Sequence, residues 1–136
     1  MNLLMDASTI VELVREGKVR YLMDAKTTPI AKYECMNAFW KESRIFKRFP
    51  AEKALELLAV LVEAFSVLEV VEPDDGRVME IALKESIPVY DALYITAALE
   101  ADAALVTEDQ KLRSVAEKYV KVMQRSDLGK TSVLRD

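Results

Sequence analysis

Four acidic residues stand where predicted strands end or predicted helices begin. Asp6 follows one short apolar run, and Asp109 lies just past another. Glu34 and Asp91 fall in the first turns of two predicted helices. Open α/β sheets bind ligands in the crevice beyond the carboxyl ends of their strands, and helix N-termini that face this crevice favour negative charge. The sequence therefore predicts that four carboxylates, widely separated along the chain, converge on one site.

A group of carboxylates in one place suits a metal ion. Unneutralised carboxylates repel one another and raise one another's pKa values. A hard divalent cation removes this repulsion, and carboxylate oxygens together with water are the ligands that Mg²⁺ and Mn²⁺ prefer. Such a cation can activate water and hold a phosphodiester without any histidine. A single acidic residue at a helix start is more often an ordinary cap, so this interpretation depends on the four acids jointly.

The composition narrows the chemistry further. The chain has 136 residues, of which 51% are hydrophobic and 31% charged, which suits one domain with a real core. It has no histidine, which excludes a Ser-His-Asp triad and His-ligated zinc. Cys35 is the single cysteine, so no intrachain disulfide can form, and its apolar helical setting favours a core residue over a reactive thiol. The net charge of −4 excludes a general attraction of the whole molecule to phosphate.

The elements that position the acids alternate between short apolar strands and longer helices. We expect strands over residues 3–5, 27–30, 67–71, 103–106 and 120–123. We expect helices over residues 8–15, 18–25, 31–47, 51–65, 74–86, 91–100 and 110–119. This alternation predicts an α/β domain with a mostly parallel sheet covered on both faces. Ser8 is the expected N-cap of the first helix, and Met36, Phe39 and Trp40 are expected to face inward as core or dimer contacts.

Four short blocks of the sequence resemble those of one protein family. They are Asp6-Ala7-Ser8, Tyr33-Glu34-Cys35-Met36-Asn37-Ala38, Tyr90-Asp91-Ala92-Leu93-Tyr94-Ile95 and Val106-Thr107-Glu108-Asp109. In this order they resemble PIN-domain proteins, and VapC-type toxin ribonucleases in particular. The resemblance covers nearly the whole chain. It implies a three-layer α/β/α sandwich in which residues 1–136 form a single nuclease domain, and an endoribonuclease that uses Mg²⁺ or Mn²⁺ to hydrolyse RNA.

The same resemblance implies roles for individual residues. The acidic quartet of catalytic and metal-binding residues is matched by Asp6, Glu34, Asp91 and Asp109. Flanking polar positions, where hydroxyl or amide groups orient carboxylates or water, are matched by Ser8, Asn37 and Thr107. The sequence departs from the family at Lys111, where a further Asp is often found. Glu108 is an alternative to Asp109 as the last ligand, and the family pattern Thr-x-Asp favours Asp109.

A stripe of positive charge is the best candidate for contact with RNA. Its members lie at three- and four-residue spacing along the helix predicted over residues 31–47, and are Lys41, Arg44, Lys47 and Arg48. We expect the group to contact the RNA backbone, although any one charged residue of this kind is usually only solvated.

Partners and location follow from similar reasoning. The resemblance implies a cognate antitoxin, and the helices that contain Met and aromatic residues favour a homodimer. No segment resembles a membrane span or a targeting signal, so we expect a cytoplasmic protein with no membrane partner.

Two other function classes were compared with the nuclease. A PIN-fold interaction or scaffold module without turnover is favoured by the acidic balance and by Lys111, and metal titration would distinguish it. A phosphoryl-accepting or phosphatase domain built on Asp6 ranks last. Such domains usually have a second Asp beside the first-strand Asp, whereas Ala7 and Ser8 follow here.

Overall fold

A central sheet of five parallel strands organises the molecule. The structure is a computed structural model that describes residues 2–130. The strand order is β3-β2-β1-β4-β5, and every neighbouring pair is parallel. The strands are β1 (Leu3–Met5), β2 (Lys26–Thr27), β3 (Glu69–Val70), β4 (Ala104–Val106) and β5 (Val122–Met123). The extent of the expected domain, residues 1–136, stays a prediction, since its last six residues lie outside the described ones.

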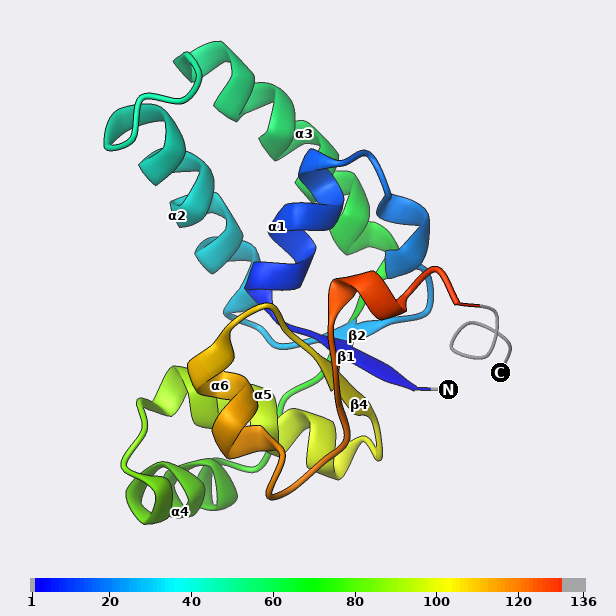
Figure 1. The fold of residues 1–136 in the computed structure, drawn as a ribbon, viewed down its shortest axis with the longest axis vertical. Coiled ribbons are helices and arrows are strands. Elements are labelled where there is room, and N and C mark those ends of the chain that lie inside the picture. The colour runs from blue at the N-terminus through cyan, green and yellow to red at the C-terminus, as the bar shows by residue number, and fades with distance from the viewer. Residues whose placement is uncertain (1, 131–136) are drawn as a thin grey trace.

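Helices cover both faces of this sheet (Figure 1). One side carries α1 (Ala7–Arg15), the 3-10 helix η1 (Val19–Leu22), α2 (Ala31–Arg44) and α3 (Ala51–Val67). The other side carries α4 (Asp75–Glu85), α5 (Val89–Glu100) and α6 (Gln110–Ala116), and a second 3-10 helix, η2 (Arg125–Asp127), follows β5. From β1 to β3 the chain moves towards one edge of the sheet, and from β3 to β5 it moves towards the other edge. Because parallel crossover connections are right-handed, the helices of these two halves lie on opposite faces of the sheet. The predicted three-layer α/β/α sandwich is therefore confirmed.

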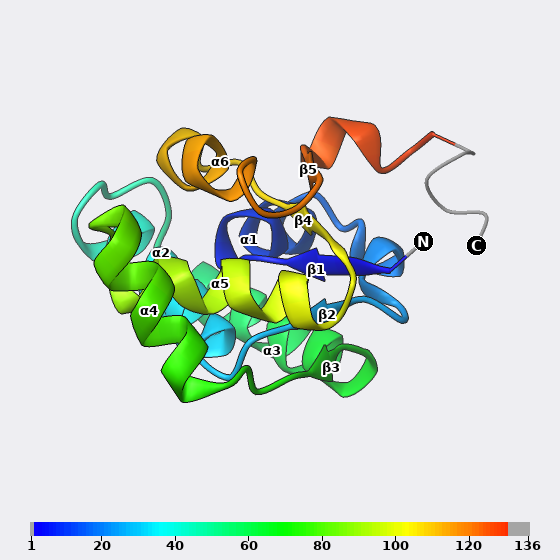
Figure 2. The same ribbon diagram turned by 90° about the horizontal axis from the view of Figure 1, so that it is seen from below.

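The core lies where the two central strands meet the helices on each face. Leu4 and Leu105 pair across β1 and β4 and have no exposed surface. Their strands are buried throughout, as expected of parallel strands with helices on both faces. Helix α5 packs against β1 and β4, and α4 packs on α5 (Figure 2). Among residues 2–130, no helix has both the length and the apolar composition needed to cross a bilayer.

The helix predicted over residues 31–47 is shorter than expected. Helix α2 ends at Arg44, and the Arg48 N–H donates to the Glu42 carbonyl at 2.8 Å as the chain turns back. Lys47 has a φ of +52°, a left-handed conformation that is incompatible with a continuing helix. Lys47 and Arg48 therefore lie in the turn between α2 and α3, which corrects the prediction that all four basic residues share one side of a helix.

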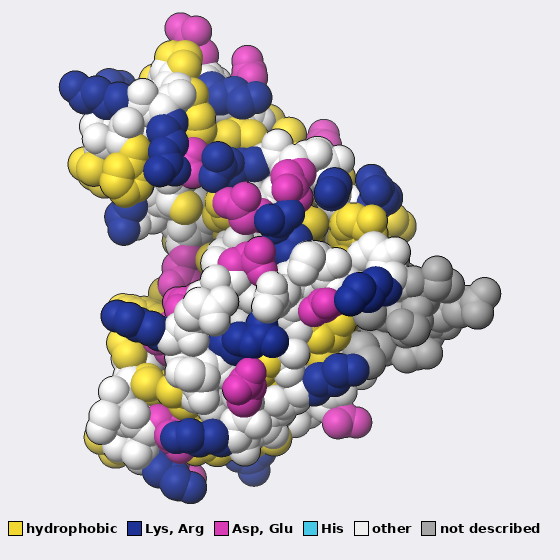
Figure 3. All heavy atoms as spheres, viewed as in Figure 1, with side chains coloured by type: hydrophobic (Ala, Val, Ile, Leu, Met, Phe, Trp, Pro, Cys, Tyr) yellow, Lys and Arg dark blue, Asp and Glu magenta, His cyan; other side chains and the backbone are white. Residues whose placement is uncertain are grey.

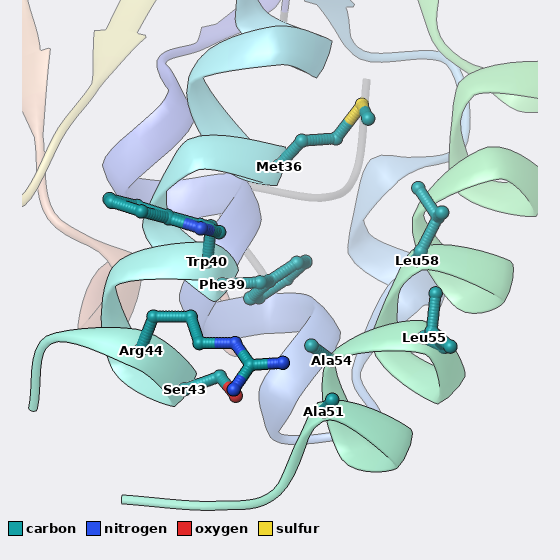
Figure 4. A pocket seen from close by; sticks show the side chains of 9 residues that line it. All are labelled: Met36, Phe39, Trp40, Ser43, Arg44, Ala51, Ala54, Leu55 and Leu58. Carbon is teal, nitrogen blue, oxygen red and sulfur yellow. The ribbon is translucent and has the colours of Figure 1, made fainter. Parts of the chain in front are cut away.

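Two of the three side chains predicted to face inward from this helix are exposed. Phe39 is buried, but the exposed fractions of Met36 and Trp40 are 36% and 51%. The buried stripe of α2 contains Cys35 and Phe39, and Met36 and Trp40 each lie one position further round the helix. They border an apolar groove of about 290 Å³ between α2 and α3, whose other side includes Leu55 (Figure 4).

Candidate active site

Two neighbouring strands deliver the first part of the candidate site. In the parallel pair of β1 and β4, Met5 lies opposite Val106. Asp6 and Thr107 therefore leave the sheet side by side, and the Asp6 N–H donates to the Val106 carbonyl at 3.2 Å. The chain leaves β1 towards β2, while β4 lies on the opposite side of β1. This reversal of strand order is the place where open α/β sheets form a ligand crevice.

Asp6 is a buried carboxylate that is held at both oxygens. It caps α1, with Oδ1 accepting from the Thr9 N–H at 3.0 Å and from Ser8 Oγ at 2.7 Å. Oδ2 accepts from Thr107 Oγ1 at 2.5 Å. Burial raises the pKa of Asp6 even though these donors act in the opposite direction. A carboxylate has about four lone-pair sites, so one site on Oδ2 stays available to a cation.

The N-cap of α1 is therefore Asp6, not Ser8 as predicted. Ser8 lies inside the first turn of the helix, and its hydroxyl donates to the cap residue. The carboxylate of Asp6 is the better cap because it sits one position before the helix and accepts the free N–H of Thr9.

Asp109 is brought to the same edge by the loop that follows β4. The Asp109 N–H donates to Thr107 Oγ1 at 3.0 Å. The same hydroxyl donates to the Asp6 carboxylate, so Thr107 contacts both acidic residues. Asp109 Oδ1 caps α6 by accepting from the N–H groups of Lys111 at 2.9 Å and Leu112 at 3.2 Å. No hydrogen bond from the described residues reaches Oδ2, and the side chain of Asp109 is exposed.

Glu34 and Asp91 approach from the first turns of α2 and α5. The Tyr94 hydroxyl donates to Glu34 Oε1 at 2.5 Å. The pKa of Glu34 is raised by burial and, to a smaller degree, by Asp91. The pKa of Asp91 is raised by burial and then by Asp109. These influences link Glu34 to Asp91 and Asp91 to Asp109, whereas Asp6 is connected to Asp109 through the hydroxyl of Thr107.

These acids have no cationic partner among the described residues. Within residues 2–130, none of the four acids forms an ion pair with Lys or Arg. Over the same residues, no three Asp, Glu, Cys or His side chains lie close enough together to ligate one metal ion directly. Mg²⁺ usually keeps several waters and takes only one or two protein carboxylates directly. The donors present, carboxylate and hydroxyl oxygens around an open crevice, fit a hydrated ion of this kind.

Comparison with known proteins decides the family. A family model described as PIN domain matches residues 3–118. The chain belongs to the PIN-domain family. It is 31% identical over 129 residues to Ribonuclease VapC3 of Pyrobaculum aerophilum, covering 88% of this chain and 95% of that protein. It is 36% identical over 80 residues to Exonuclease VapC9 of the same organism, covering 59% of this chain and 58% of that protein, which is less than two thirds of its length.

Solved structures agree with this assignment at the level of the fold. The crystal structure of PAE2754 from Pyrobaculum aerophilum superposes with a TM-score of 0.77 at 24% identity, covering 94% of this chain and 93% of that one. The structure of VapBC-1 from nontypeable Haemophilus influenzae gives 0.54 at 17% identity, covering 93% and 99%. Together with the VapC names of both relatives, the match confirms the predicted resemblance to VapC-type PIN domains.

Among residues 2–130, the remaining residues predicted for the site of this PIN domain form no hydrogen bond or ion pair with the four acids. Asn37 is exposed one turn beyond Glu34, and no hydrogen bond in residues 2–130 joins its side chain to the acids. Lys41 and Arg44 are exposed on α2, and the other two basic residues lie in the turn that follows. Figure 3 shows Lys and Arg side chains at the end of the molecule that α2 and α3 form, and others spread over the rest of this face.

Two contacts of the site were not predicted. Tyr94 belongs to one of the family blocks, and its spacing three residues after Asp91 on a helix is a signal that both face the same way. Glu108 turns to Arg125, whose backbone N–H donates to Oε2 at 3.1 Å and whose Nε lies 3.3 Å from Oε1. No pattern in the sequence announces this second contact. Because both oxygens of Glu108 face Arg125, the geometry favours Asp109 as the last ligand.

Proposed function

We propose that this PIN domain is a metal-dependent endoribonuclease and the toxin of a toxin–antitoxin pair. The observation that carries the proposal is a set of four carboxylates at one edge of the sheet that no lysine or arginine of the described chain neutralises. Three of them, Asp6, Glu34 and Asp91, have raised pKa values. The match to Ribonuclease VapC3 supports the same activity.

The chain's own residues divide the work of hydrolysis. Mg²⁺ or Mn²⁺, when bound, would lower the pKa of a water molecule and offset the negative charge of the phosphodiester. Asp6, Asp91 and Asp109 would hold the hydrated ion, in part through its water ligands, with Ser8 and Thr107 fixing the orientation of the Asp6 carboxylate. Glu34 has one oxygen held by Tyr94, and its raised pKa suits the acceptance of a proton from water at the other. Asn37 would act as a further polar contact beyond Glu34.

The basic residues near the end of α2 would hold the RNA backbone. Lys41, Arg44 and Lys47 are exposed and form no ion pair within residues 2–130. Arg48 is 3.7 Å from the carboxylate of Glu42, so part of its charge is already offset. Positive charge gathered here would attract phosphate although the whole chain carries −4.

Exposed apolar surfaces on α2, α3 and α4 are candidate contact surfaces for protein partners. The groove bordered by Met36, Trp40 and Leu55 suits an apolar segment of an antitoxin, with the Arg44 guanidinium beside it for an acidic side chain (Figure 4). The structural similarity to VapBC-1 supports an antitoxin partner. Met79 and Leu83, four residues apart and exposed on α4, support a second copy of the chain. A toxin that acts on RNA in this way would work in the cytoplasm.

A circular RNA tests the proposal against its nearest alternative. The relative named Exonuclease VapC9 favours digestion from an end, and a circle has no end. We expect the wild-type protein to open a circular single-stranded RNA with Mg²⁺ or Mn²⁺ and to leave it intact with EDTA. Digestion of linear RNA alone would indicate an exonuclease. Cleavage of neither RNA would contradict the nuclease and favour the scaffold.

A further inference from the structure

A second ionic cluster borders the acidic site. Arg125, the first residue of η2, lies between two carboxylates. Its NH1 donates to both oxygens of Glu16 at 2.7 and 2.6 Å, and its backbone N–H donates to Glu108 Oε2 at 3.1 Å. Glu16 follows the last residue of α1, and Glu108 belongs to the loop after β4. Arg125 therefore joins three segments that meet beside the candidate cation site.

Glu108 is tied to the site through its main chain as well. Its N–H donates to Ser8 Oγ at 3.0 Å, and Ser8 Oγ donates to Asp6 Oδ1 at 2.7 Å. The next residue is Asp109. The main chain of Glu108 is therefore fixed, and its side chain lies against Arg125 in a cleft of about 390 Å³ whose lining includes Glu34 but not Asp6, Asp91 or Asp109.

The position of Glu108 matters because it carries a fifth carboxylate. A released carboxylate one residue from Asp109 adds negative charge beside the cation and offers it another oxygen ligand. Such a ligand tightens binding of the cation, displaces water from it and weakens its effect on the water that remains. We therefore expect that release of Glu108 into the site would tighten metal binding and slow hydrolysis.

We propose that Arg125 is a positioning residue that holds Glu108 out of the cation site. The inference rests on the proposed function and adds to it a residue that the family blocks do not contain. It also explains why the chain tolerates two adjacent acids in the loop after β4: one faces the crevice, and the other is neutralised by Arg125.

The test uses Arg125→Met, which keeps the side-chain stem and removes the charge. Calorimetric titration of the RNA-free protein should show Mn²⁺ binding at least about threefold tighter than in wild type, because Glu108 is released. Turnover of RNA should fall by about tenfold or more. The double variant Arg125→Met/Glu108→Gln should return both values to within about threefold of wild type, since the released charge is gone.

A matched control is Arg113→Met. It removes another Arg–Glu pair, in which Arg113 Nε lies 3.1 Å from the carboxylate of Glu117 at the end of α6, and should leave Mn²⁺ affinity and turnover unchanged because this pair does not include Glu108. Thermal unfolding of each variant monitors the fold. Mn²⁺ binding in Arg125→Met that is unchanged or weaker, or a double variant that does not recover, would overturn the inference, because loosened structure weakens metal binding rather than strengthening it.

Glu108→Gln alone provides a second test that does not depend on how well Arg125→Met folds. Its Mn²⁺ affinity should stay within about twofold of wild type, because Glu108 is held away from the ion. A loss of about tenfold would make Glu108 a ligand and contradict the inference. A wild-type protein that neither binds Mn²⁺ nor cuts RNA contradicts the proposed function itself, whereas wild-type binding and cleavage with no change in Arg125→Met contradicts the inference alone.

Discussion

The candidate site depends on how three carboxyl groups ionise. Burial raises the pKa values of Asp6, Glu34 and Asp91 from ordinary values of 3.8 for Asp and 4.5 for Glu. A raised pKa means that the fold disfavours the charged form that a cation needs. In the metal-free protein, the ionised acids are destabilised by repulsion and by lost hydration. A bound cation would relieve this destabilisation.

Asp91→Asn should separate activity from stability. The change removes a charge but little volume, so RNA cleavage should fall by about 100-fold or more. The metal-free variant should unfold at a higher temperature than wild type at pH 7.5, because a disfavoured charge is gone. Gel assays of cleavage and thermal unfolding in EDTA measure the two effects. A fully active variant would remove Asp91 from the site.

The metal-free protein should also become less stable as pH rises. The folded state keeps protons on the three acids at pH values where the unfolded chain has lost them, so their contribution to stability is present below the ordinary values and lost as pH rises through the raised pKa values. The measurement is the difference in unfolding temperature between metal-free wild type and Asp91→Asn, followed from pH 4.5 to 7.5. Mn²⁺ should flatten this difference; an opposite slope would contradict the raised pKa values.

Sequence alone predicted the types and places of these acids but not their contacts. The strand-end positions of Asp6 and Asp109 follow from short apolar runs, and the structure agrees with both positions. The contact of Arg125 with Glu108 joins residues 17 apart and belongs to no periodic pattern. Which oxygen of a carboxylate is free depends on donors from other segments, and these are known only after folding.

At the scale of elements, the loop after β4 connects two acids of the site through one residue. One hydroxyl, that of Thr107, donates to Asp6 and accepts from the Asp109 N–H. Two acids separated by about a hundred residues are thereby held by a single side chain at the point where β1 and β4 end together.

Thr107→Val tests this arrangement. It leaves a buried Asp6 oxygen and the Asp109 N–H without their partner, which should lower the free energy of unfolding by about 1–3 kcal/mol. Cleavage should fall by about tenfold to 100-fold, since the orientation of the ligands is lost. Thr96→Val is the matched control, because its hydroxyl bonds only to the Ala92 carbonyl within α5. Equal activity of the two variants would contradict a positioning role for Thr107.

Element types were more predictable than element ends. All five strands occur near the predicted positions, because short β-branched or apolar runs between helices are distinctive. The helix predicted over residues 31–47 fails at its end, where Lys47 takes a left-handed conformation and the chain reverses. Periodicity cannot show this turn, since the residues beyond Arg44 continue a helix-like pattern.

At the scale of the whole molecule, charge is unevenly distributed. The chain carries −4 overall, while Lys41, Arg44, Lys47 and Arg48 gather at the end formed by α2 and α3. We expect this local group of positive charges to attract a polyanion to this end of the molecule.

Reversal of two of these charges should therefore weaken RNA binding. In Arg44→Glu/Arg48→Glu, the slope of log affinity against log salt should become shallower by about 1.4, since two phosphate contacts are lost from a single strand. Fluorescence anisotropy with a labelled RNA at several salt concentrations measures the slope. The control Lys84→Glu/Lys121→Glu changes the net charge equally on other elements. Identical slopes in both variants would show that the end of α2 does not contact RNA.

The central claim is that four distant carboxylates form one cation site, and diffraction can test it directly. Crystals of the wild-type protein soaked in Mn²⁺ should give an anomalous peak in the crevice between Asp6, Asp91 and Asp109, and this peak should be absent in Asp91→Asn. A peak only at other carboxylates, or none near Asp6 in the wild-type crystals, would contradict the claim.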